Sequence, residues 1–175
     1  MTTMRILMVT PQLPRPGQPG TLAPTVRQIE SIRDLGIDVH VLEVRGVKRL
    51  KYLQRMKDLH SLARSVDLIH AHYGYCGWLA RSQRNTPVVV SFMGDDLLGT
   101  PDAAGNISAF SKWVVQADCW LAHKVDAVID KSAAMARIVA PVNAHVIPNG
   151  VDLNVFRPMD MRAAKAALGL ADHKR

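Results

Sequence analysis

Residues 67–96, DLIHAHYGYCGWLARSQRNTPVVVSFMGDD, decide the fold class of this chain. They hold two short apolar runs, LIHAHY and PVVVSF, on either side of a segment, GWLARSQR, that we expect to be a short helix. Runs that are apolar at successive positions are typical of strands covered on both faces. A strand, a helix and a second strand in this order predict a parallel βαβ unit, because parallel strands need a crossover connection.

The same alternation continues along the chain in both directions. Further strands are expected at residues 5–10, 38–44, 126–130 and 145–148, and further helices at residues 25–35, 45–64, 108–123, 131–139 and 160–170. The Pro- and Gly-rich residues 11–24 and residues 93–106 are expected to be loops. We therefore predict an α/β fold, a Rossmann-like doubly wound parallel sheet of about six to seven strands, with ligands in the crevice at the carboxyl ends of the strands.

Length and composition suit one globular domain with a substantial core. Every apolar run is shorter than the roughly 18 to 20 residues of a membrane-spanning helix, and the N-terminus lacks the cleavage region of a signal peptide. We therefore expect a cytoplasmic protein. The two cysteines, Cys76 and Cys119, make no disulfide framework and lack the spacing of metal ligands.

The positive charge is concentrated in the first half, where residues 1–87 hold 13 Lys and Arg against 6 Asp and Glu. A cluster in residues 45–64 indicates an anionic partner such as a membrane surface, nucleic acid or a phosphate-bearing substrate. Tyr52, Met56, Leu59 and Ala63 recur at helical spacing, and we expect this stripe to face the core. Leu50 and Leu53 lie among the cations, which suits a membrane-surface face, with a solvated basic helix as the alternative. We expect no nucleic-acid partner. The candidate membrane contacts are Lys48, Arg49, Lys51, Arg55 and Lys57.

The first loop that follows a strand holds Gly20 and Thr21 just before a helix N-terminus, where backbone N–H groups can face a phosphate. Its glycine spacing is not G-x-G-x-x-G, and no G-K-[ST] follows. The alternative is therefore a loop that only connects the strand to the helix and binds no phosphate.

Two pairs of polar residues lie where expected strands end. His70 and His72 are two apart on a strand, so their side chains point to the same face. We expect His72 to face the crevice and contact substrate, and His70 to be a hydrogen-bonded buried histidine. Asp95 and Asp96 are neighbours that can point in different directions, so a helix cap, a partner for a sugar hydroxyl and a catalytic role all stay open.

Five segments, in the order LGIDVHVL, DLIHAHYG, PVVVSFMGDDLLGT, VDAVIDKSAAMARIV and VIPNGVDLNVFRP, carry a resemblance. With them the chain closely resembles the N-terminal domain of family-4 glycosyltransferases of the GT-B fold. The resemblance implies that residues 1–158 form a Rossmann-like acceptor domain. Residues 159–175 would then begin the linker to a C-terminal donor domain that the chain lacks.

The same resemblance implies a retaining transferase that moves a sugar from a nucleotide-sugar donor to a glycan or lipid-linked acceptor. The enzyme would need no metal or other cofactor and would serve cell-envelope polysaccharide synthesis, in the cytoplasm or peripherally at the inner face of the membrane. This half alone would be inactive.

Site residues are also implied by the resemblance, although no catalytic residue is assigned. Gly20 and Thr21 would lie near the donor diphosphate. Met93 stands where family members commonly carry a histidine, which removes one expected polar contact. The acceptor or sugar contacts would be His72, Gly94, Asp95, Asp96 and Ser132, and the interdomain turn would be Asn149, Gly150 and Asp152.

Two other functions stay open. The basic segment could serve a stand-alone module that binds an anionic lipid or glycan without catalysis. Another GT-B enzyme, such as a sugar-nucleotide epimerase, is the second alternative, although this version of the PNGVD turn is not expected there.

Overall fold

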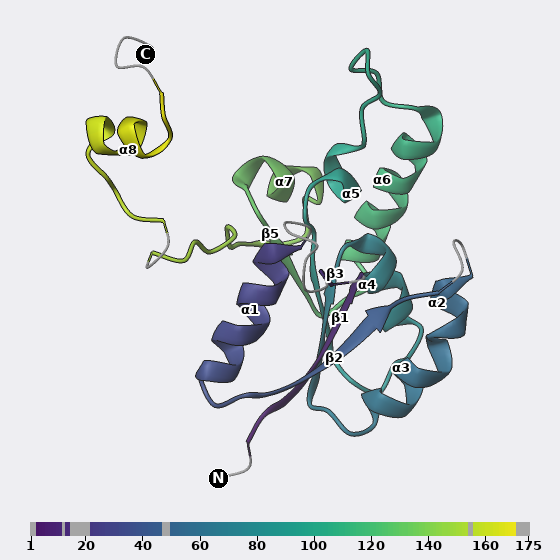
Figure 1. The fold of residues 1–175 in the computed structure, drawn as a ribbon. Coiled ribbons are helices and arrows are strands. Elements are labelled where there is room, and N and C mark those ends of the chain that lie inside the picture. The colour runs from purple at the N-terminus through teal and green to yellow at the C-terminus, as the bar shows by residue number, and fades with distance from the viewer. Residues whose placement is uncertain (1–2, 12, 15–21, 47–49, 154–155, 171–175) are drawn as a thin grey trace.

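The computed structural model describes residues 3–11, 13–14, 22–46, 50–153 and 156–170. In this part of the chain, six strands form one sheet in which every neighbouring pair is parallel (Figure 1). The order across the sheet is β2-β1-β3-β4-β5-β6. The strands are β1 (Arg5–Pro11), β2 (Asp38–Val44), β3 (Leu68–His72), β4 (Val88–Ser91), β5 (Ala127–Asp130) and β6 (His145–Val146). The predicted α/β fold with a parallel sheet is confirmed.

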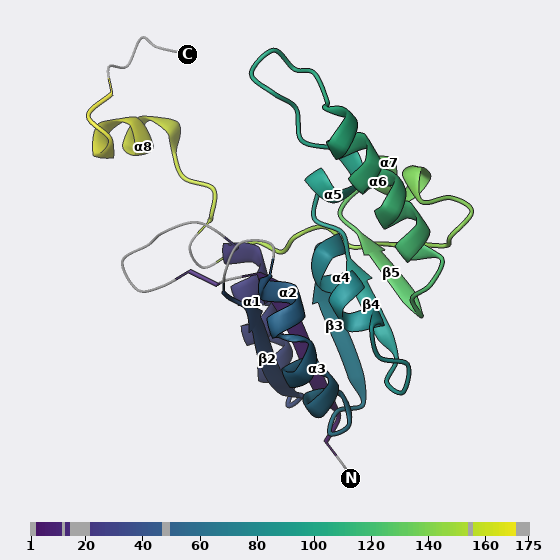
Figure 2. The same cartoon turned by 90° about the vertical axis from the view of Figure 1, so that its right-hand side faces the viewer.

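Helices cover both faces of the sheet. In Figure 1 the sheet is seen nearly edge-on, with α1 on one side and α2, α3, α4 and α6 on the other; Figure 2 shows this second group side by side. α8 lies apart from the sheet in both views. The helices of the described residues are α1 (Ala23–Asp34), α2 (Lys51–Gln54), α3 (Met56–Ala63), α4 (Gly74–Arg81), α5 (Asp95–Leu98), α6 (Ala109–Ala122), α7 (Ala133–Ile138) and α8 (Met161–Ala167).

Alternation along β1 divides the apolar side chains between two cores. Leu7 and Val9 belong to the larger core, to which α3, α4 and α6 contribute. Ile6 and Met8 point to the other face, where Ile29 of α1 covers them. β1 lies between β2 and β3, so the chain reverses its direction across the sheet at β1. Such a reversal opens a crevice at the carboxyl ends of the strands.

We predicted one helix over the basic residues 45–64. The structure instead has two short helices in this segment, α2 and α3, which meet at Arg55. The predicted inward stripe is confirmed, because Leu59 and Ala63 are buried and Tyr52 and Met56 pack against the core. Leu50 and Leu53 are exposed. The candidates Lys48 and Arg49 lie outside the described residues.

Three predicted boundaries were wrong. The expected loop at residues 93–106 contains α5, because Gly94 (φ 147°) turns the chain directly before it. The helix expected at residues 77–84 begins earlier, at Gly74. The buried strand expected at 145–148 is only the two exposed residues of β6, because β6 forms the edge of the sheet and pairs only with β5. None of the described helices is long and apolar enough to cross a membrane.

Candidate functional site

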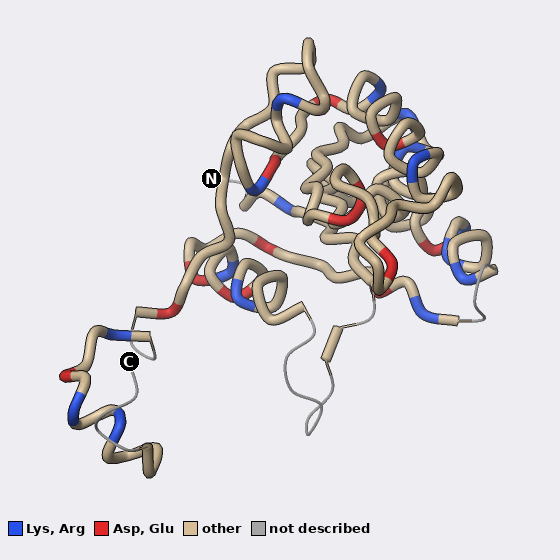
Figure 3. The backbone as a smooth tube through the Cα atoms, turned by 90° about the horizontal axis from the view of Figure 1, so that it is seen from above, with Lys and Arg blue, Asp and Glu red and all other residues tan. Residues whose placement is uncertain are grey.

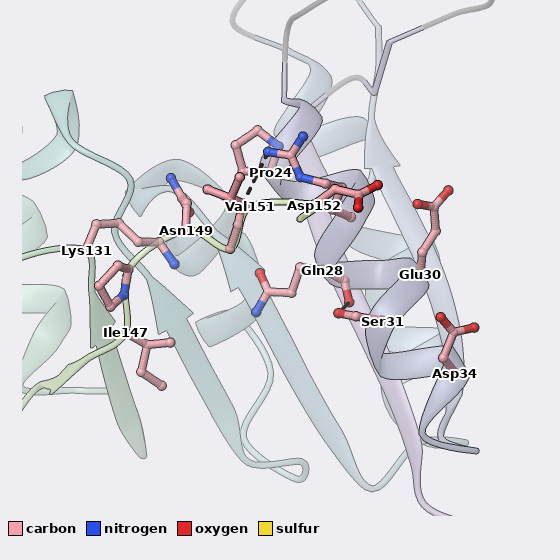
Figure 4. A pocket seen from close by; sticks show the side chains of 13 residues that line it. Pro24, Gln28, Glu30, Ser31, Asp34, Lys131, Ile147, Asn149, Val151 and Asp152 are labelled. Atoms are coloured by element: carbon pink, nitrogen blue, oxygen red, sulfur yellow. Dashed lines mark hydrogen bonds between the residues drawn. The ribbon is translucent and has the colours of Figure 1, made fainter. Parts of the chain in front are cut away.

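The carboxyl ends of the strands border two separate hollows. The first, here called the α1 hollow, has a volume of about 580 Å³ and lies between α1 and residues 147–152 (Figure 4). The second, the α6 hollow, has a volume of about 530 Å³ and lies between α5, the loop at residues 99–108 and the first turns of α6. We predicted that the site candidates share one crevice. Of those that the structure describes, Asp95 and Asp96 line the α6 hollow and the interdomain turn lines the α1 hollow, whereas His72, Gly94 and Ser132 line neither.

The predicted interdomain turn lines the α1 hollow. Asn149, Gly150 and Asp152 all contribute to its wall, and Nη2 of Arg27 donates a hydrogen bond to the carbonyl oxygen of Gly150 at 3.5 Å. Figure 4 shows the side chains of Gln28, on α1, and Lys131, after β5, pointing toward one another across this hollow. Burial lowers the pKa of Lys131. An amide and a cation that face one another can bind a phosphate or a polar sugar substituent.

His72 lies beneath the α1 hollow and does not face it openly. Its side chain is fully buried, and its Nε2 is 2.9 Å from Oε1 of Gln28. An amide oxygen only accepts, so Nε2 carries the proton and Nδ1, which has no partner in the described structure, carries the lone pair. We expected His72 to face the crevice directly, but Gln28 of α1 lies between them and covers it. Its predicted substrate contact remains a prediction that requires Gln28 to move.

Both histidines of β3 point to the same face, as predicted, and their rings stack with centroids 4.7 Å apart. Nε2 of His70 is 2.8 Å from Oγ of Ser91, so the predicted hydrogen-bonded buried histidine is confirmed. Burial lowers the pKa of His70 to about 4 and that of His72 to about 2. Both imidazoles are therefore neutral at physiological pH and offer hydrogen bonds without charge.

Asp95 and Asp96, on α5, diverge at the wall of the α6 hollow. Asp95 is exposed, whereas Asp96 is 6 % exposed. The Asp96 carboxylate accepts hydrogen bonds from the backbone N–H groups of Met93, at 3.0 Å, and Gly94, at 2.9 Å. Burial raises the pKa of Asp96, and these hydrogen bonds oppose that rise. Asp96 therefore holds the turn that enters α5, which is the helix-cap role among those left open.

Two further carboxylates lie behind Asp96. Burial, and next the charge of Asp96, raise the pKa of Asp118 to about 7 and that of Asp130 to about 6. Nε1 of Trp78 donates a hydrogen bond to Oδ1 of Asp118 at 3.1 Å. The Asp118 carboxylate also lies against Gly74, where a Cβ atom would overlap it. This cluster on β5, α5 and α6 is not evident from the sequence.

The remaining candidates have simpler positions. Ser132 is the exposed N-cap of α7, and its Oγ accepts a hydrogen bond from the backbone N–H of Met135 at 3.3 Å. Gly20 and Thr21 lie outside the described residues. Among the residues that the structure describes, no group of three or more His, Cys, Asp or Glu side chains could hold a metal ion.

Several lining residues are not singled out by the sequence pattern. Tyr73, which lines the α6 hollow, lies in the HYGYCG segment directly after β3, so its strand-end position is a usable signal. Lys131 has the same signal, because it directly follows β5. Gln28 carries none, because its role depends on how α1 faces the end of β5. Tyrosine hydroxyls, carboxylates, an amide and an aromatic ring come together in the α6 hollow. Such a lining can hydrogen-bond and cover a molecule with many hydroxyl groups.

Comparisons with known proteins agree with this architecture. Two curated relatives, both D-inositol 3-phosphate glycosyltransferases, come from Mycobacterium avium and a Nocardioides species. The first is 33 % identical over 113 residues, which cover 59 % of this chain and 27 % of the relative. The second is 34 % identical over 118 residues, which cover 61 % and 25 %. The chain thus spans about a quarter of the length of these relatives.

Two solved structures share the fold. Sucrose-phosphate synthase from Thermosynechococcus elongatus superposes with a TM-score of 0.70 at 16 % identity, over 96 % of this chain and 53 % of that one. Anabaena HepE, in complex with UDP and glucose, superposes with a TM-score of 0.51 at 21 % identity, over 95 % and 50 %. Both likenesses support the prediction of a Rossmann-like half of a GT-B architecture.

The family model for a glycosyl transferase 4-like domain matches residues 3–150, which include all six strands and both hollows except for the last residues of the α1 hollow. The alternatives of a non-catalytic module and of an epimerase are not favoured by this match. The chain belongs to the glycosyl transferase 4-like domain family.

Proposed function

We propose that this chain is the acceptor-binding half of a retaining glycosyltransferase that uses a nucleotide-sugar donor. The acceptor is a glycan or a lipid-linked molecule of cell-envelope polysaccharide synthesis. A second domain, facing the carboxyl ends of the strands, binds the donor. Transfer needs no metal ion in this proposal, and the chain alone does not turn over.

The α6 hollow is the observation that carries the proposal. It lies at the carboxyl ends of the strands, and hydroxyl, carboxylate and amide groups from Tyr73, Asp95 and Asn106 line it together with the ring of Phe110. Carboxylates and amides accept hydrogen bonds from sugar hydroxyls, and an aromatic ring covers the apolar face of a sugar ring. Anabaena HepE, solved with UDP and glucose, and the D-inositol 3-phosphate glycosyltransferases support this class of ligand here.

In the proposed reaction, the chain positions one acceptor hydroxyl against the anomeric carbon of the donor sugar. The new bond joins the acceptor oxygen to that carbon, while the bond to the nucleoside diphosphate breaks and the diphosphate leaves with its electron pair. The proton of the acceptor hydroxyl passes to the leaving diphosphate oxygen. Retention requires the hydroxyl to attack the face of the sugar from which the diphosphate leaves, and holding the two reactants in this orientation can supply a large part of the rate enhancement. The α1 hollow, with Lys131 and Gln28, would lie beside the leaving diphosphate or the donor sugar.

The test is a titration of the isotope-labelled chain, followed by amide chemical shifts, with methyl hexosides, inositol phosphate and UDP-glucose as separate probes. We expect a methyl hexoside or inositol phosphate to shift the amides around the α6 hollow. The Asp95→Asn and Asn106→Ala variants should weaken this binding about tenfold, because each loses a hydrogen-bonding group. Asp34→Asn, a matched change at the wall of the α1 hollow, should leave it unchanged.

Tight binding of UDP-glucose at the α6 hollow, with no response to the hexosides or inositol phosphate, would contradict the assignment of this half to the acceptor. A radiolabelled-sugar assay provides the second arm. Donor-dependent transfer by the 175-residue chain at rates typical of complete enzymes would refute the need for a donor domain.

We also propose peripheral contact with an anionic membrane through α2 and α3. Leu50 and Leu53 are exposed beside Lys51, and Arg55 is paired with Asp58 at 2.8 Å. Vesicle flotation of a variant in which Lys51, Arg55 and Lys57 are replaced by glutamine measures this contribution. Undiminished binding would remove these residues from the proposal.

A further inference from the structure

An aromatic surface on α4 and α6 extends beyond the α6 hollow, which Tyr75 and Phe110 also line. It consists of Tyr75, Trp78, Phe110, Trp113 and Trp120 and is called here the aromatic face. Phe110, Trp113 and Trp120 follow one another at helical spacing along one side of α6, and they are 68 %, 65 % and 54 % exposed. A soluble domain rarely leaves so many large aromatic side chains together in water, and such a patch indicates an interaction surface.

Two ring contacts and a shared groove connect the residues of the aromatic face. The rings of Phe110 and Trp113 lie 6.2 Å apart, and those of Trp78 and Trp120 stack at 5.2 Å. Between α4 and α6 a groove of about 430 Å³ is lined almost entirely by apolar groups, with Tyr75 on one wall and Trp113 and Trp120 on the other. Asp118 closes the bottom of this groove and is 2 % exposed.

Cations border the aromatic face. Nζ of Lys124 lies 5.0 Å from the ring centroid of Trp120, and Lys112 is exposed on the same helix. Arg81 and Arg84 line a hollow that Trp78 and Trp120 also border. α6 carries one acidic residue, the buried Asp118. Figure 3 shows Lys and Arg distributed over the helices on this side of the sheet.

We propose that the aromatic face docks the chain on an anionic lipid bilayer. Tryptophan and other large aromatic side chains prefer the headgroup region, where the ring contacts acyl chains and a polar edge stays in water. Lysine and arginine beside them pair with anionic headgroups. A second copy of the chain fits less well, because a two-fold interface would bring two cationic borders together while α6 offers only the buried Asp118 as a counter-charge.

The aromatic face also adjoins the α6 hollow, since Tyr75 and Val114 line both that hollow and the groove, and Phe110 belongs to the hollow as well. This step rests on the proposed function: a lipid-linked acceptor would keep its lipid in the bilayer while its sugar entered the α6 hollow. The docking itself does not depend on transfer, so it can be tested without donor or acceptor.

The test is flotation of the chain with vesicles of phosphatidylcholine that contain about a quarter phosphatidylglycerol. We expect binding of the wild type, about tenfold or more weaker binding of Phe110→Ser/Trp113→Ser, and unchanged binding of Leu35→Ser. Leu35 is the matched control because it is 78 % exposed at the end of α1, on the other side of the sheet. Circular dichroism verifies that both variants are folded.

A second set of variants distinguishes binding to anionic headgroups from binding by apolar contact alone. Lys112→Gln/Lys124→Gln should bind the anionic vesicles about 30-fold more weakly, whereas Arg157→Gln/Arg162→Gln, which removes two cations from the C-terminal segment, should not. Quenching of tryptophan fluorescence by brominated lipids should occur in the wild type and decrease in Trp113→Ser. This readout reports insertion even if flotation is weak.

Three results would overturn the proposal. These are no flotation of the wild type, flotation that Phe110→Ser/Trp113→Ser leaves intact, and a concentration-dependent dimer that this variant abolishes in the absence of vesicle binding. The last result would assign the aromatic face to a second copy. Because the vesicles contain neither donor nor acceptor, failure here leaves the acceptor-half proposal standing, and a failed glycoside titration leaves a positive vesicle result standing.

Discussion

Replacing Asp118 by asparagine should increase the stability of the fold at alkaline pH and not in mild acid. Burial and the charge of Asp96 raise the pKa of Asp118 to about 7, from an ordinary value of 3.8. Between these two values the folded state binds a proton that the unfolded state has released. The stability of the wild type therefore falls as the pH rises through this window.

The size of the effect follows from the shift in the pKa of Asp118. A rise in pKa from 3.8 to about 7 corresponds to at most about 4 kcal/mol of unfolding free energy, lost by the time the carboxyl is fully ionised. An asparagine keeps an oxygen for Nε1 of Trp78 but adds amide hydrogens that need partners, which costs about 1–2 kcal/mol. We expect the variant to be equal to the wild type or less stable near pH 4, and about 2–3 kcal/mol more stable near pH 8.

The assay is urea unfolding of both proteins at several pH values between about 4 and 8, followed by circular dichroism. Burial lowers the pKa values of His70 and His72, so these groups stabilise the fold as the pH rises, but they are present in both proteins and cancel in the difference. The difference in unfolding free energy between variant and wild type should change with pH. If it does not, or if the wild type is the more stable protein at pH 8, the ionised Asp118 carboxylate does not destabilise the fold and the reasoning is refuted.

Two further substitutions test the packing beside the site. Gly77→Ala should lower the unfolding free energy by about 1 kcal/mol. A Cβ at this position would lie 2.7 Å from Cδ2 of Leu121 and 2.9 Å from Cγ2 of Val90, and this overlap outweighs the better helix propensity of alanine. Equal or higher stability in urea would show that α4 has room to shift. Ser91→Ala should cost about 1–3 kcal/mol, because it leaves the buried Nε2 of His70 without its 2.8 Å partner, and an unchanged melting temperature would indicate that water replaces the hydroxyl.

Much of the fold is readable from the order of local patterns. Strand runs such as PVVVSF are apolar at successive positions, and this pattern requires helices on both sides of the sheet wherever the strand lies. The expected inward stripe on the basic segment was also correct, because helical spacing alone determines which residues share a face. Boundaries were less accurate where one backbone position decides them, as Gly94 does for α5.

The environment of the candidate site residues could not be predicted from local patterns. The sequence placed His72, Asp96 and Asn149 at the ends of strands, which is where they lie. Their environments depend on distant elements: α1 covers His72 through Gln28, and α6 brings Asp118 behind Asp96 and raises its pKa. These contacts join residues about 20 to 45 positions apart, and no local pattern encodes their distances.

The sequence by itself therefore determined the alternation of strands and helices, the parallel sheet and the family resemblance, because each rests on short-range periodicity or on contiguous motifs. Only the tertiary structure decided that the crevice is divided into two hollows and that the aromatic residues of α6 form one exposed face. Helical spacing shows that Phe110, Trp113 and Trp120 share a side of α6. Whether that side faces the core or the solvent depends on how α6 packs against α4, where Leu121 and the buried Asp118 occupy the inner side.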